Sequence, residues 1–267
     1  MEYVKDAIDK ARKERRAEAK SARAGYRAGI NPSGTKDDSP ELRRGETCTR
    51  VEAPDKDTLL KSRIVAAFEH DERAEPYRQL RTQILKKFRE QGWRTLAITS
   101  AHADAGKSLT ALNTAIALSR DVNQTVLLVD LDFKGPDLLG MLGLSTGAGL
   151  VEYLQDAVEL QDILVNPGME RLTILPANPV SGATSEILSS PQMKRALDEI
   201  VYRYDDRIIV FDLPPLLRDD DALVFVPYVD TTLLVVESGV TTPEEMERCI
   251  QLLEGVDILG TILNKSY

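Results

Sequence analysis

Cysteine, histidine and tryptophan are scarce in this chain, which has two cysteines, two histidines and one tryptophan among its 267 residues. The cysteines, Cys48 and Cys249, lie far apart and have no metal-ligand neighbour in the sequence. We therefore expect no disulfide framework and a reducing compartment, the cytoplasm. The two histidines, His70 and His102, are too few to build a histidine-based zinc site.

Long apolar runs and an excess of basic residues are also missing. No apolar run approaches the ~20 residues of a membrane span, so we expect no transmembrane segment. The first residues, Met-Glu-Tyr-Val-Lys-Asp, lack the apolar core of a secretory signal. The net charge of −9 argues against a general nucleic-acid binder. The hydrophobic content of 42% is ordinary for a soluble protein, and the length allows one α/β domain plus an appendage.

The beginning of the chain differs in composition from the rest. Residues 1–29 are rich in Lys, Arg, Ala and Glu, and their few apolar residues recur at helical spacing, which predicts a charged helix. Its basic excess could contact anionic lipid or a partner protein, although a solvated helix or arm is the commoner case. Residues 30–57 show no periodicity and predict a flexible linker. The globular domain is therefore expected at residues 58–267.

The remainder of the chain is organised around residues 95–113. A short apolar run leads into a loop of small and polar residues, which closes on Gly106, Lys107 and Ser108 before a helix-like run begins. This order predicts a phosphate-binding loop, because backbone N–H groups of the loop and of the helix N-terminus would point at the phosphates. Lys107 would reach the β- and γ-phosphates, and the Ser108 hydroxyl would ligate Mg²⁺. The residues expected to bind nucleotide here are Ala105, Gly106, Lys107, Ser108 and Leu109.

Aspartates stand at the ends of two strongly apolar runs. Residues 125–130 predict a buried parallel strand that ends at Asp130 and is followed by Asp132, and the run 207–212 ends at Asp212. Carboxylates at the carboxyl ends of strands beside a phosphate loop lie where α/β sheets bind ligands. There they can hold Mg²⁺, directly or through water, and one can accept the proton of an attacking hydroxyl. One such Asp could be a strand-end cap, but three of them with a phosphate loop predict a nucleotide and Mg²⁺ site.

Strand-like and helix-like segments alternate along the domain. This pattern predicts an α/β fold of the P-loop NTPase type, with a mostly parallel sheet and helices on both faces, preceded by the N-terminal helix and linker. Within one expected helix, Glu75, Arg78 and Arg81 are three residues apart and form a charged ridge beside an apolar face. Further strands are expected at 171–176, 232–236 and 258–263, and helices at 74–90, 109–120, 189–202 and 243–254.

These motifs resemble, in their order, the Walker A, Walker A′ and Walker B motifs of bacterial tyrosine kinases. The matching segments are residues 106–108, 126–134 and 208–215. These kinases are P-loop proteins of the MinD/ParA-like class that regulate capsule and exopolysaccharide export. The resemblance covers roughly residues 58–267 and is greatest to the cytoplasmic autokinases encoded with exopolysaccharide and exosortase loci.

The resemblance implies roles for the residues of the phosphate loop and the strand ends. Lys107 would bind the phosphates of ATP, while Ser108 and Asp212 would hold Mg²⁺. Asp130 and Asp132 would activate the tyrosine hydroxyl and assist the metal. Catalysis would then depend mainly on positioning and charge neutralisation, as phosphoryl transfer generally does.

The resemblance also implies an adenine contact, a self-assembly and a partner. Asn264, after the last strand, matches the position that recognises adenine. Glu75, Arg78 and Arg81 match a Glu-x-x-Arg-x-x-Arg motif that builds a ring-shaped oligomer, in which the tail of one subunit reaches the site of the next. The expected partner is the cytoplasmic segment of a membrane polysaccharide co-polymerase. That partner would recruit this cytoplasmic protein to the inner face of the cell membrane.

Four positions depart from the pattern of the family. Ala101 replaces the first glycine of the phosphate loop, and Lys134 replaces an arginine, which removes a two-pronged hydrogen bond. Asp104 occupies a loop position often held by glycine, and Asp tolerates the left-handed backbone that glycine would supply. We expect Asp104 to point outward, because two negative charges ~4 Å apart would repel by about 1–4 kcal/mol. His102 is expected to face solvent rather than to take part in catalysis.

The chain ends in a single tyrosine, Tyr267, where members of the family typically end in a cluster of tyrosines that are phosphorylated in trans. Tyr267 is a candidate acceptor. With Asn264 on the nucleotide, however, the three residues of the tail would span only about 10 Å. Either the acceptors lie elsewhere, for example at Tyr3 or Tyr26 on the N-terminal arm, or autophosphorylation is weak.

Two functions are compatible with these features. The first is an ATP-dependent protein tyrosine autokinase that controls polysaccharide chain length or export, which the paired Asp130 and Asp132 and the Glu75 motif favour. The second is a nucleotide-switched interaction protein of the same fold with negligible tyrosine transfer, which the altered loop and the single tail tyrosine favour. We favour the kinase. A chromosome- or division-site-positioning ATPase is disfavoured, because Ala101 and His102 replace the Gly-Lys pair that opens the loop of those proteins.

Overall fold

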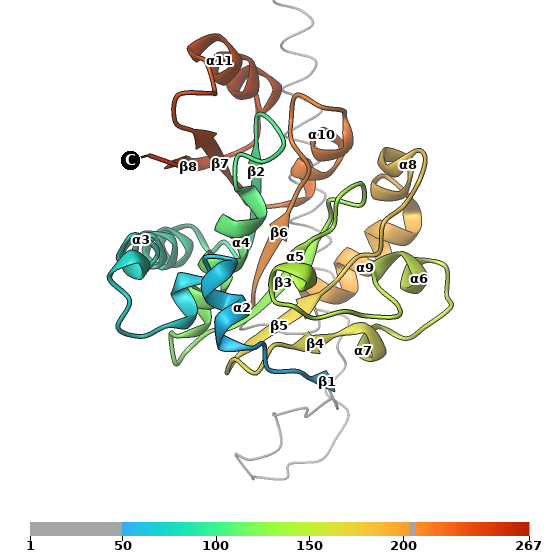
Figure 1. Cartoon of the computed structure of the whole chain (residues 1–267). Coiled ribbons are helices and arrows are strands. Elements are labelled where there is room, and N and C mark those ends of the chain that lie inside the picture. The colour runs from blue at the N-terminus through green and yellow to red at the C-terminus, as the bar shows by residue number, and fades with distance from the viewer. Residues whose placement is uncertain (1–49, 203–206, 267) are drawn as a thin grey trace, which may run out of the picture. The chain divides into compact units, whose positions relative to one another are not determined.

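The computed structural model describes residues 50–202 and 207–266, and Figure 1 shows how their helices and strands are arranged. The helix expected at residues 1–29, most of the expected linker and the candidate acceptors Tyr3, Tyr26 and Tyr267 lie outside these residues. No helix in the described ranges is both long enough and apolar enough to cross a bilayer.

Eight strands form one sheet in the described part of the chain, in the order β1-β4-β5-β3-β6-β2-β7-β8. Neighbouring strands are parallel except for β4 and β5, which are antiparallel. The prediction of a mostly parallel sheet is therefore confirmed. The strands are β1 (Arg50–Val51), β2 (Thr95–Ser100), β3 (Thr125–Asp130), β4 (Val165–Asn166), β5 (Leu172–Leu175), β6 (Arg207–Asp212), β7 (Thr231–Glu237) and β8 (Ile258–Asn264).

Helices cover both faces of this sheet, as expected for an α/β fold. One face carries α2 (Lys56–Lys61), α3 (Glu75–Gln91), α4 (Lys107–Ser119) and α5 (Leu138–Met141). The other face carries α6 (Leu150–Leu154), α7 (Leu160–Ile163), α8 (Thr184–Leu188), α9 (Pro191–Tyr202), α10 (Asp221–Phe225) and α11 (Pro243–Leu252). Three short 3₁₀ helices complete the described elements, at Val65–Ala67, Glu72–Ala74 and Val226–Tyr228.

The apolar run of β3 shows why both faces are covered. Leu127 and Val129 point into the core on the α9 side, whereas Val126 and Leu128 point into the core on the α4 side. Successive side chains of a strand face opposite sides of a sheet, so an unbroken apolar run needs a layer of helices on each side. The continuous hydrophobicity of this strand therefore follows from its central place in the sheet.

The folded part of the chain begins earlier than the predicted boundary at residue 58. Arg50 and Val51 pair with Val165 and Asn166 of β4, and α2 begins at Lys56. The side chain of Asp55 caps α2 by accepting a hydrogen bond from the backbone N–H of Thr58 at 3.1 Å. Two paired residues and a helix of less than two turns leave no periodicity in the sequence, which is why residues 50–57 look like a linker.

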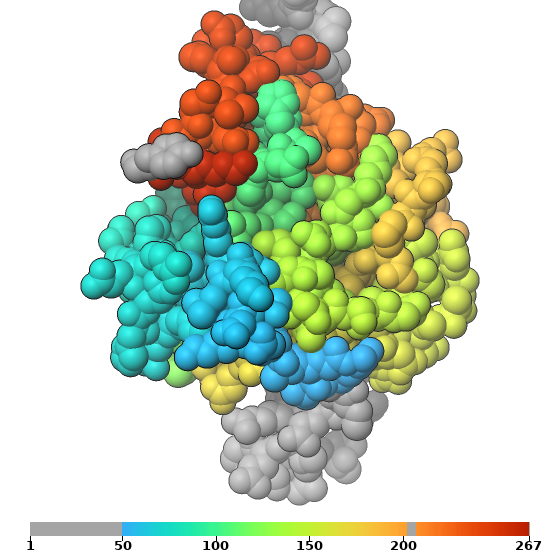
Figure 2. All heavy atoms as spheres, in the orientation of Figure 1, coloured from blue at the N-terminus to red at the C-terminus, as the bar shows by residue number. Residues whose placement is uncertain are grey.

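The first helix of the described fold packs beside α5. In the space-filling view, the blue segment that contains α2 lies directly against the yellow-green segment around α5 (Figure 2). Leu59 of α2 and Leu139 of α5 belong to the same buried cluster, and a Cβ atom on Gly143 would meet the side chain of Thr58 at 3.0 Å. The helix α2, which begins inside the predicted linker, therefore contributes Leu59 to the core.

The order of the strands brings three strand ends to one edge of the sheet. β6 lies between β3 and β2, so that Asp212 is the register partner of Asp130 on one side and of Ile98 on the other. The loop after β2 leads directly into α4. The carboxylates of β3 and β6 and the N-terminus of α4 thus lie at the carboxyl edge of the sheet, where ligands of α/β proteins bind.

Candidate functional site

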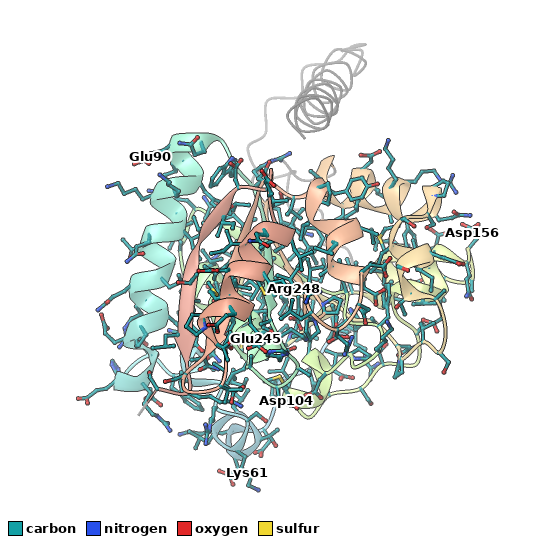
Figure 3. All side chains as sticks on the ribbon, turned by 90° about the horizontal axis from the view of Figure 1, so that it is seen from above. Lys61, Glu90, Asp104, Asp156, Glu245 and Arg248 are labelled. Carbon is teal, nitrogen blue, oxygen red and sulfur yellow. The ribbon has the colours of Figure 1, made fainter. Side chains whose placement is uncertain are left out.

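The loop between β2 and α4 has the backbone that a phosphate loop requires. Gly106 has φ +94°, a left-handed conformation that L-residues rarely adopt, and it precedes the first residue of α4. Asp104 also has a left-handed backbone, with φ 61°, and it is exposed. Figure 3 shows Asp104 on the same side of the molecule as Glu245 of α11. Both expectations about Asp104, its backbone and its outward position, are confirmed.

Asn264 at the end of β8 contacts this loop. Its side-chain Nδ2 donates a hydrogen bond to the carbonyl oxygen of Ala105 at 2.8 Å. A Cβ atom on Gly106 would lie only 2.0 Å from the same Nδ2 atom. The last strand therefore supports the phosphate loop through one amide, and the left-handed φ of Gly106 together with this close approach favours glycine at position 106. Recognition of adenine by Asn264 stays a prediction.

Lys107 opens α4 with a buried ammonium group. Its Nζ lies 2.9 Å from Asp132 Oδ2, 2.9 Å from Ser108 Oγ and 3.7 Å from Asp212 Oδ1. Burial lowers the pKa of Lys107, but the charges of Asp212, Asp132 and Asp130 outweigh burial, so this pKa lies above its usual value. The ammonium group of Lys107 therefore stays charged among the oxygens of Ser108, Asp132 and Asp212, which are the expected ligands of the metal and the expected proton acceptor.

The three predicted aspartates converge around Lys107, and their environments differ. Asp130 and Asp212 are almost fully buried. Burial raises the pKa of both, Asp212 raises that of Asp130 further, and Lys107 offsets these effects only in part. Burial also raises the pKa of Asp132, but Lys107 and Arg218 outweigh it, so the pKa of Asp132 lies below its usual value. The site thus concentrates negative charge beside the phosphate loop.

These oxygens suit a magnesium ion. Both carboxylate oxygens of Asp212 are buried and accept no well-formed hydrogen bond from the described residues, although Lys107 and Ser108 lie close to them. Hard oxygen donors of this kind are what Mg²⁺ prefers, and Ser108 Oγ lies close by. No group of three or more His, Cys, Asp or Glu side chains in the described ranges forms a metal site of its own. Mg²⁺ often needs only one or two carboxylates, because water and substrate phosphates complete its shell.

A chain of ion pairs joins the site to Lys134 of the Walker A′ match and to Arg218 and Asp219, for which the sequence shows no motif. Arg218 Nη2 lies 2.9 Å from Asp132 Oδ1, and Arg218 Nε lies 3.0 Å from Asp219 Oδ2. Lys134 Nζ is 2.7 Å from Asp219 and 3.2 Å from Asp221. Lys134 therefore pairs with the loop after β6. Sequence reasoning missed Arg218, and its position three residues after the double proline of the Asp212 motif is the one available signal.

The side chain of His102 contacts another part of the chain instead of facing only solvent. Its side chain is 40% exposed, and its Nε2 lies 2.9 Å from Glu245 Oε1 in the first turn of α11. Glu245 also completes the N-terminal capping box of α11 with Thr242. The expectation that His102 simply faces solvent therefore needs correction, because this side chain ties the phosphate loop to α11. The partner residue lies 143 positions along the chain, so no local pattern could reveal it.

The Glu75 motif lies away from the phosphate loop. Arg78 Nε pairs with Glu75 Oε2 at 2.7 Å, as expected for neighbours on one ridge of α3. Arg81 Nη1 donates to the carbonyl oxygen of Ala117 at 3.5 Å. Ala117 is ten residues after Lys107 on α4, about 15 Å along the helix axis at 1.5 Å per residue. The structure therefore brings these three residues together but places them beside the far end of α4.

Comparison with known proteins places the fold and the site in a family. Residues 93–266 match the ParA family model, which is described as NUBPL iron-transfer P-loop NTPase. The tyrosine-protein kinase YwqD of Bacillus subtilis is 30% identical over 193 residues, which are 72% of this chain and 80% of YwqD. The succinoglycan biosynthesis transport protein ExoP of Rhizobium meliloti is 33% identical over 211 residues, covering 77% of this chain and 26% of ExoP.

A solved kinase domain is similar in structure. The tyrosine-protein kinase etk of Escherichia coli is 32% identical over 196 residues, which are 73% of this chain and 27% of etk. The solved kinase domain of etk superposes on the present structure with a TM-score of 0.65. The match covers 72% of this chain and 74% of the solved etk chain. This chain thus spans about a quarter of the length of etk and of ExoP. The chain belongs to the family of bacterial tyrosine-protein kinases, within the ParA-type P-loop NTPases.

Proposed function

We propose that this protein is an ATP- and Mg²⁺-dependent protein tyrosine kinase. The observation that supports this proposal most directly is the convergence of Lys107, Asp130, Asp132 and Asp212 beside the phosphate loop. In the reaction, the tyrosine oxygen would form a bond to the γ-phosphorus of ATP while the bond from that phosphorus to ADP breaks. The hydroxyl proton would pass to the carboxylate pair of Asp130 and Asp132.

Each residue of the site has a role in this proposal. The backbone N–H groups of residues 105–109 and the N-terminus of α4 would hold the phosphates. Lys107 would leave Asp132 and bind the β- and γ-phosphates, while Ser108 and Asp212 would hold the metal. Mg²⁺, when bound, would neutralise the charge that develops on the transferred group. Because Arg218 bonds Oδ1 of Asp132, the departure of Lys107 would leave Oδ2 free to face the substrate.

The process that this kinase would serve is exopolysaccharide or capsule biosynthesis and export. This part of the proposal is supported by the similarity to ExoP, whose name describes succinoglycan biosynthesis transport. The partner would be the cytoplasmic segment of a membrane co-polymerase, which would recruit the kinase to the inner face of the membrane. The Glu75, Arg78 and Arg81 ridge would contact a neighbouring subunit in a ring. Tyr267 is the proposed acceptor, with Tyr3 and Tyr26 as alternatives.

The test is phosphotyrosine detection by mass spectrometry after incubation of the purified protein with ATP and Mg²⁺. Lys107→Met and Asp130→Asn serve as controls. We expect phosphotyrosine in the parent protein and none in either variant, and its position would name the acceptor. If the parent binds ATP yet stays unmodified in the presence of the co-polymerase segment, the kinase proposal fails.

The phosphotyrosine experiment also tests a second function, that of a nucleotide-switched interaction protein. The observation that favours this function is that cations already bind both carboxylate oxygens of Asp132. Lys107 holds Oδ2 and Arg218 holds Oδ1, so the charge of this one carboxylate is balanced within the protein. Such a site favours a nucleotide-switched interaction protein, in which ATP binding changes assembly or docking and turnover is slow. ATP-dependent assembly without phosphotyrosine would support this alternative.

A further inference from the structure

Two cations meet at Asp219, in the loop that follows β6. Its Oδ2 atom lies 2.7 Å from Lys134 Nζ and 3.0 Å from Arg218 Nε. Its Oδ1 atom accepts a hydrogen bond from the backbone N–H of Asp221 at 3.3 Å. Burial raises the pKa of Asp219, but hydrogen bonds from Lys134 and Arg218 outweigh burial, so this pKa lies below its usual value. The carboxylate of Asp219 therefore stays charged and is held at both of its oxygens.

Arg218 connects this carboxylate to the site. Its Nε donates a hydrogen bond to Asp219, and its Nη2 donates one to Oδ1 of Asp132 at 2.9 Å. A guanidinium group is planar and rigid, so a bond that fixes Nε also fixes the direction in which Nη2 points. The side chain of Arg218 is 34% exposed, and without Asp219 it would be free to turn toward water. The contact between Arg218 and Asp132 therefore depends on Asp219.

The far end of this path is anchored in the core. Lys134 Nζ lies 3.2 Å from Oδ2 of Asp221, a residue that is only 2% exposed. The same oxygen accepts a hydrogen bond from the hydroxyl group of Thr184, which is also buried. Lys134 thus lies between two carboxylates, one fixed in the core and the other bound to Arg218. This alternation of cations and carboxylates holds the loop after β6 in place beside the site.

The contact of Arg218 with Asp132 becomes more important when nucleotide binds. In the proposed reaction, Lys107 leaves Asp132 for the phosphates, and Arg218 is then the remaining cation on Asp132 among the described residues. Misplacement of a reacting group by ~1 Å can lower a rate about a hundredfold. The orientation of Asp132 during the reaction would thus be set by Arg218 and, through Arg218, by Asp219.

We propose that Asp219 is a positioning residue of the kinase reaction, which acts on Asp132 through Arg218. Asp219 holds the guanidinium group in the direction that engages Oδ1 of Asp132, and this leaves Oδ2 for the substrate. Lys134 and the backbone of Asp221 hold Asp219 from the other side. The inference rests on the proposed function, because it requires Asp132 to face the reacting tyrosine.

The test is a double-mutant cycle on kcat for phosphotyrosine formation by the full chain with ATP and Mg²⁺. Asp219→Asn should lower kcat at least about threefold, with the KM for ATP within about twofold of the parent. The double variant Asp219→Asn/Arg218→Ala should have the same kcat as Arg218→Ala alone, because Asp219 then has no guanidinium group to position. Asp219→Glu keeps the charge and should recover part of kcat.

A matched control removes the same charge from the next residue. Asp220 is exposed and its side chain makes no capping bond to α10, so Asp220→Asn should leave kcat unchanged. Thermal unfolding reports whether each variant is folded.

The outcomes separate this inference from the proposed function. A parent protein that forms no phosphotyrosine overturns both. An active parent overturns the inference alone in either of two cases: if folded Asp219→Asn is as active as the parent, or if the double variant loses the product of the two single losses. Multiplied losses would mean that Asp219 and Arg218 act independently.

Discussion

At the scale of single residues, two buried carboxyl groups lie next to each other in the site, which disfavours their charged forms. Asp130 and Asp212 are register partners on adjacent strands, and both are buried. The pKa of each is raised above its ordinary value because burial disfavours the carboxylate form. A protein without nucleotide must bear this cost, which a bound metal would remove. Sites of this kind commonly trade stability for function.

Replacing Asp130 with asparagine should therefore stabilise the protein while removing its activity. We expect the free energy of unfolding to rise by roughly 1 kcal/mol, or about 2–4 °C in the unfolding midpoint for a domain of this size. The measurement is thermal unfolding without nucleotide or Mg²⁺. The difference in stability between Asp130→Asn and the parent protein should shrink as pH falls. The reason is that Asp130, whose pKa is raised, then also becomes neutral in the parent protein. A variant less stable than the parent at neutral pH would contradict this account.

Arg218 gives a second prediction at this scale. Its Nη2 atom holds Oδ1 of Asp132, so Arg218→Ala should let the carboxylate turn away from the substrate. We expect kcat to fall about tenfold, a loss of ~1.4 kcal/mol, with the KM for ATP within about twofold of the parent. Arg218→Lys keeps one charged hydrogen bond and should recover part of kcat. Steady-state kinetics measure both parameters, and a change confined to KM would show that Arg218 acts on nucleotide binding instead.

At the scale of elements, the boundaries of the fold depend on short segments. β1 has two residues and pairs with β4, more than 110 positions later. The backbone N–H of Glu52 donates to the carbonyl oxygen of Asn166 at 2.9 Å, and Asp55 caps α2. These contacts are distant in sequence or confined to one helical turn. They are nevertheless part of the same compact unit as the rest of the described fold.

Two truncated chains should distinguish between a folded domain that starts at residue 58, as predicted from the sequence, and one that includes β1, as observed. A chain that starts at Thr47 keeps β1 and the Asp55 cap, and it should unfold at the same midpoint as the parent. A chain that starts at Thr58 loses both, and its free energy of unfolding should fall by at least about 1 kcal/mol, the usual value of a helix cap. Chemical denaturation measures the difference. Equal stability of the two chains would show that β1 and the Asp55 cap contribute nothing to the stability of the fold.

At the scale of the whole molecule, the parallel sheet assembles the site from distant parts of the chain. The phosphate loop follows β2, Asp130 and Asp212 end β3 and β6, Asp132 follows β3, and Asn264 ends β8. Asn264 and the pair of His102 with Glu245 tie the loop to the last elements of the fold. Binding of nucleotide and metal should therefore stabilise the entire domain rather than one loop.

This coupling predicts a thermal shift on ligand binding. At a concentration of Mg²⁺·ATP one hundred times its Kd, binding should add about 2.7 kcal/mol to the free energy of unfolding. For this size of domain the unfolding midpoint should rise by roughly 5–10 °C. Removal of Mg²⁺ with EDTA should abolish most of the shift, and Lys107→Met should abolish it altogether. A full shift in that variant would mean that the nucleotide binds elsewhere.

Much of the fold was predictable because its signals are local. The buried runs that became β3 and β6 and the helices that became α3, α4, α9 and α11 are long enough to show apolar continuity or helical spacing. The short elements β1, β4, α5 and α10 have too few residues for either pattern. The strand-end aspartates were also predictable, because parallel strands all place their carboxyl ends at one edge.

The sequence by itself determined the α/β class, the phosphate loop and the three aspartates, because spacing along the chain encodes these features. Only the tertiary structure decided which distant side chains meet. Arg218 reaches Asp132 across 86 residues, Asn264 reaches Ala105 across 159, and Lys134 reaches Asp219 across 85. Such contacts depend on the order of strands in the sheet, which no local pattern carries. The ion pairs around the site are therefore properties of the folded chain.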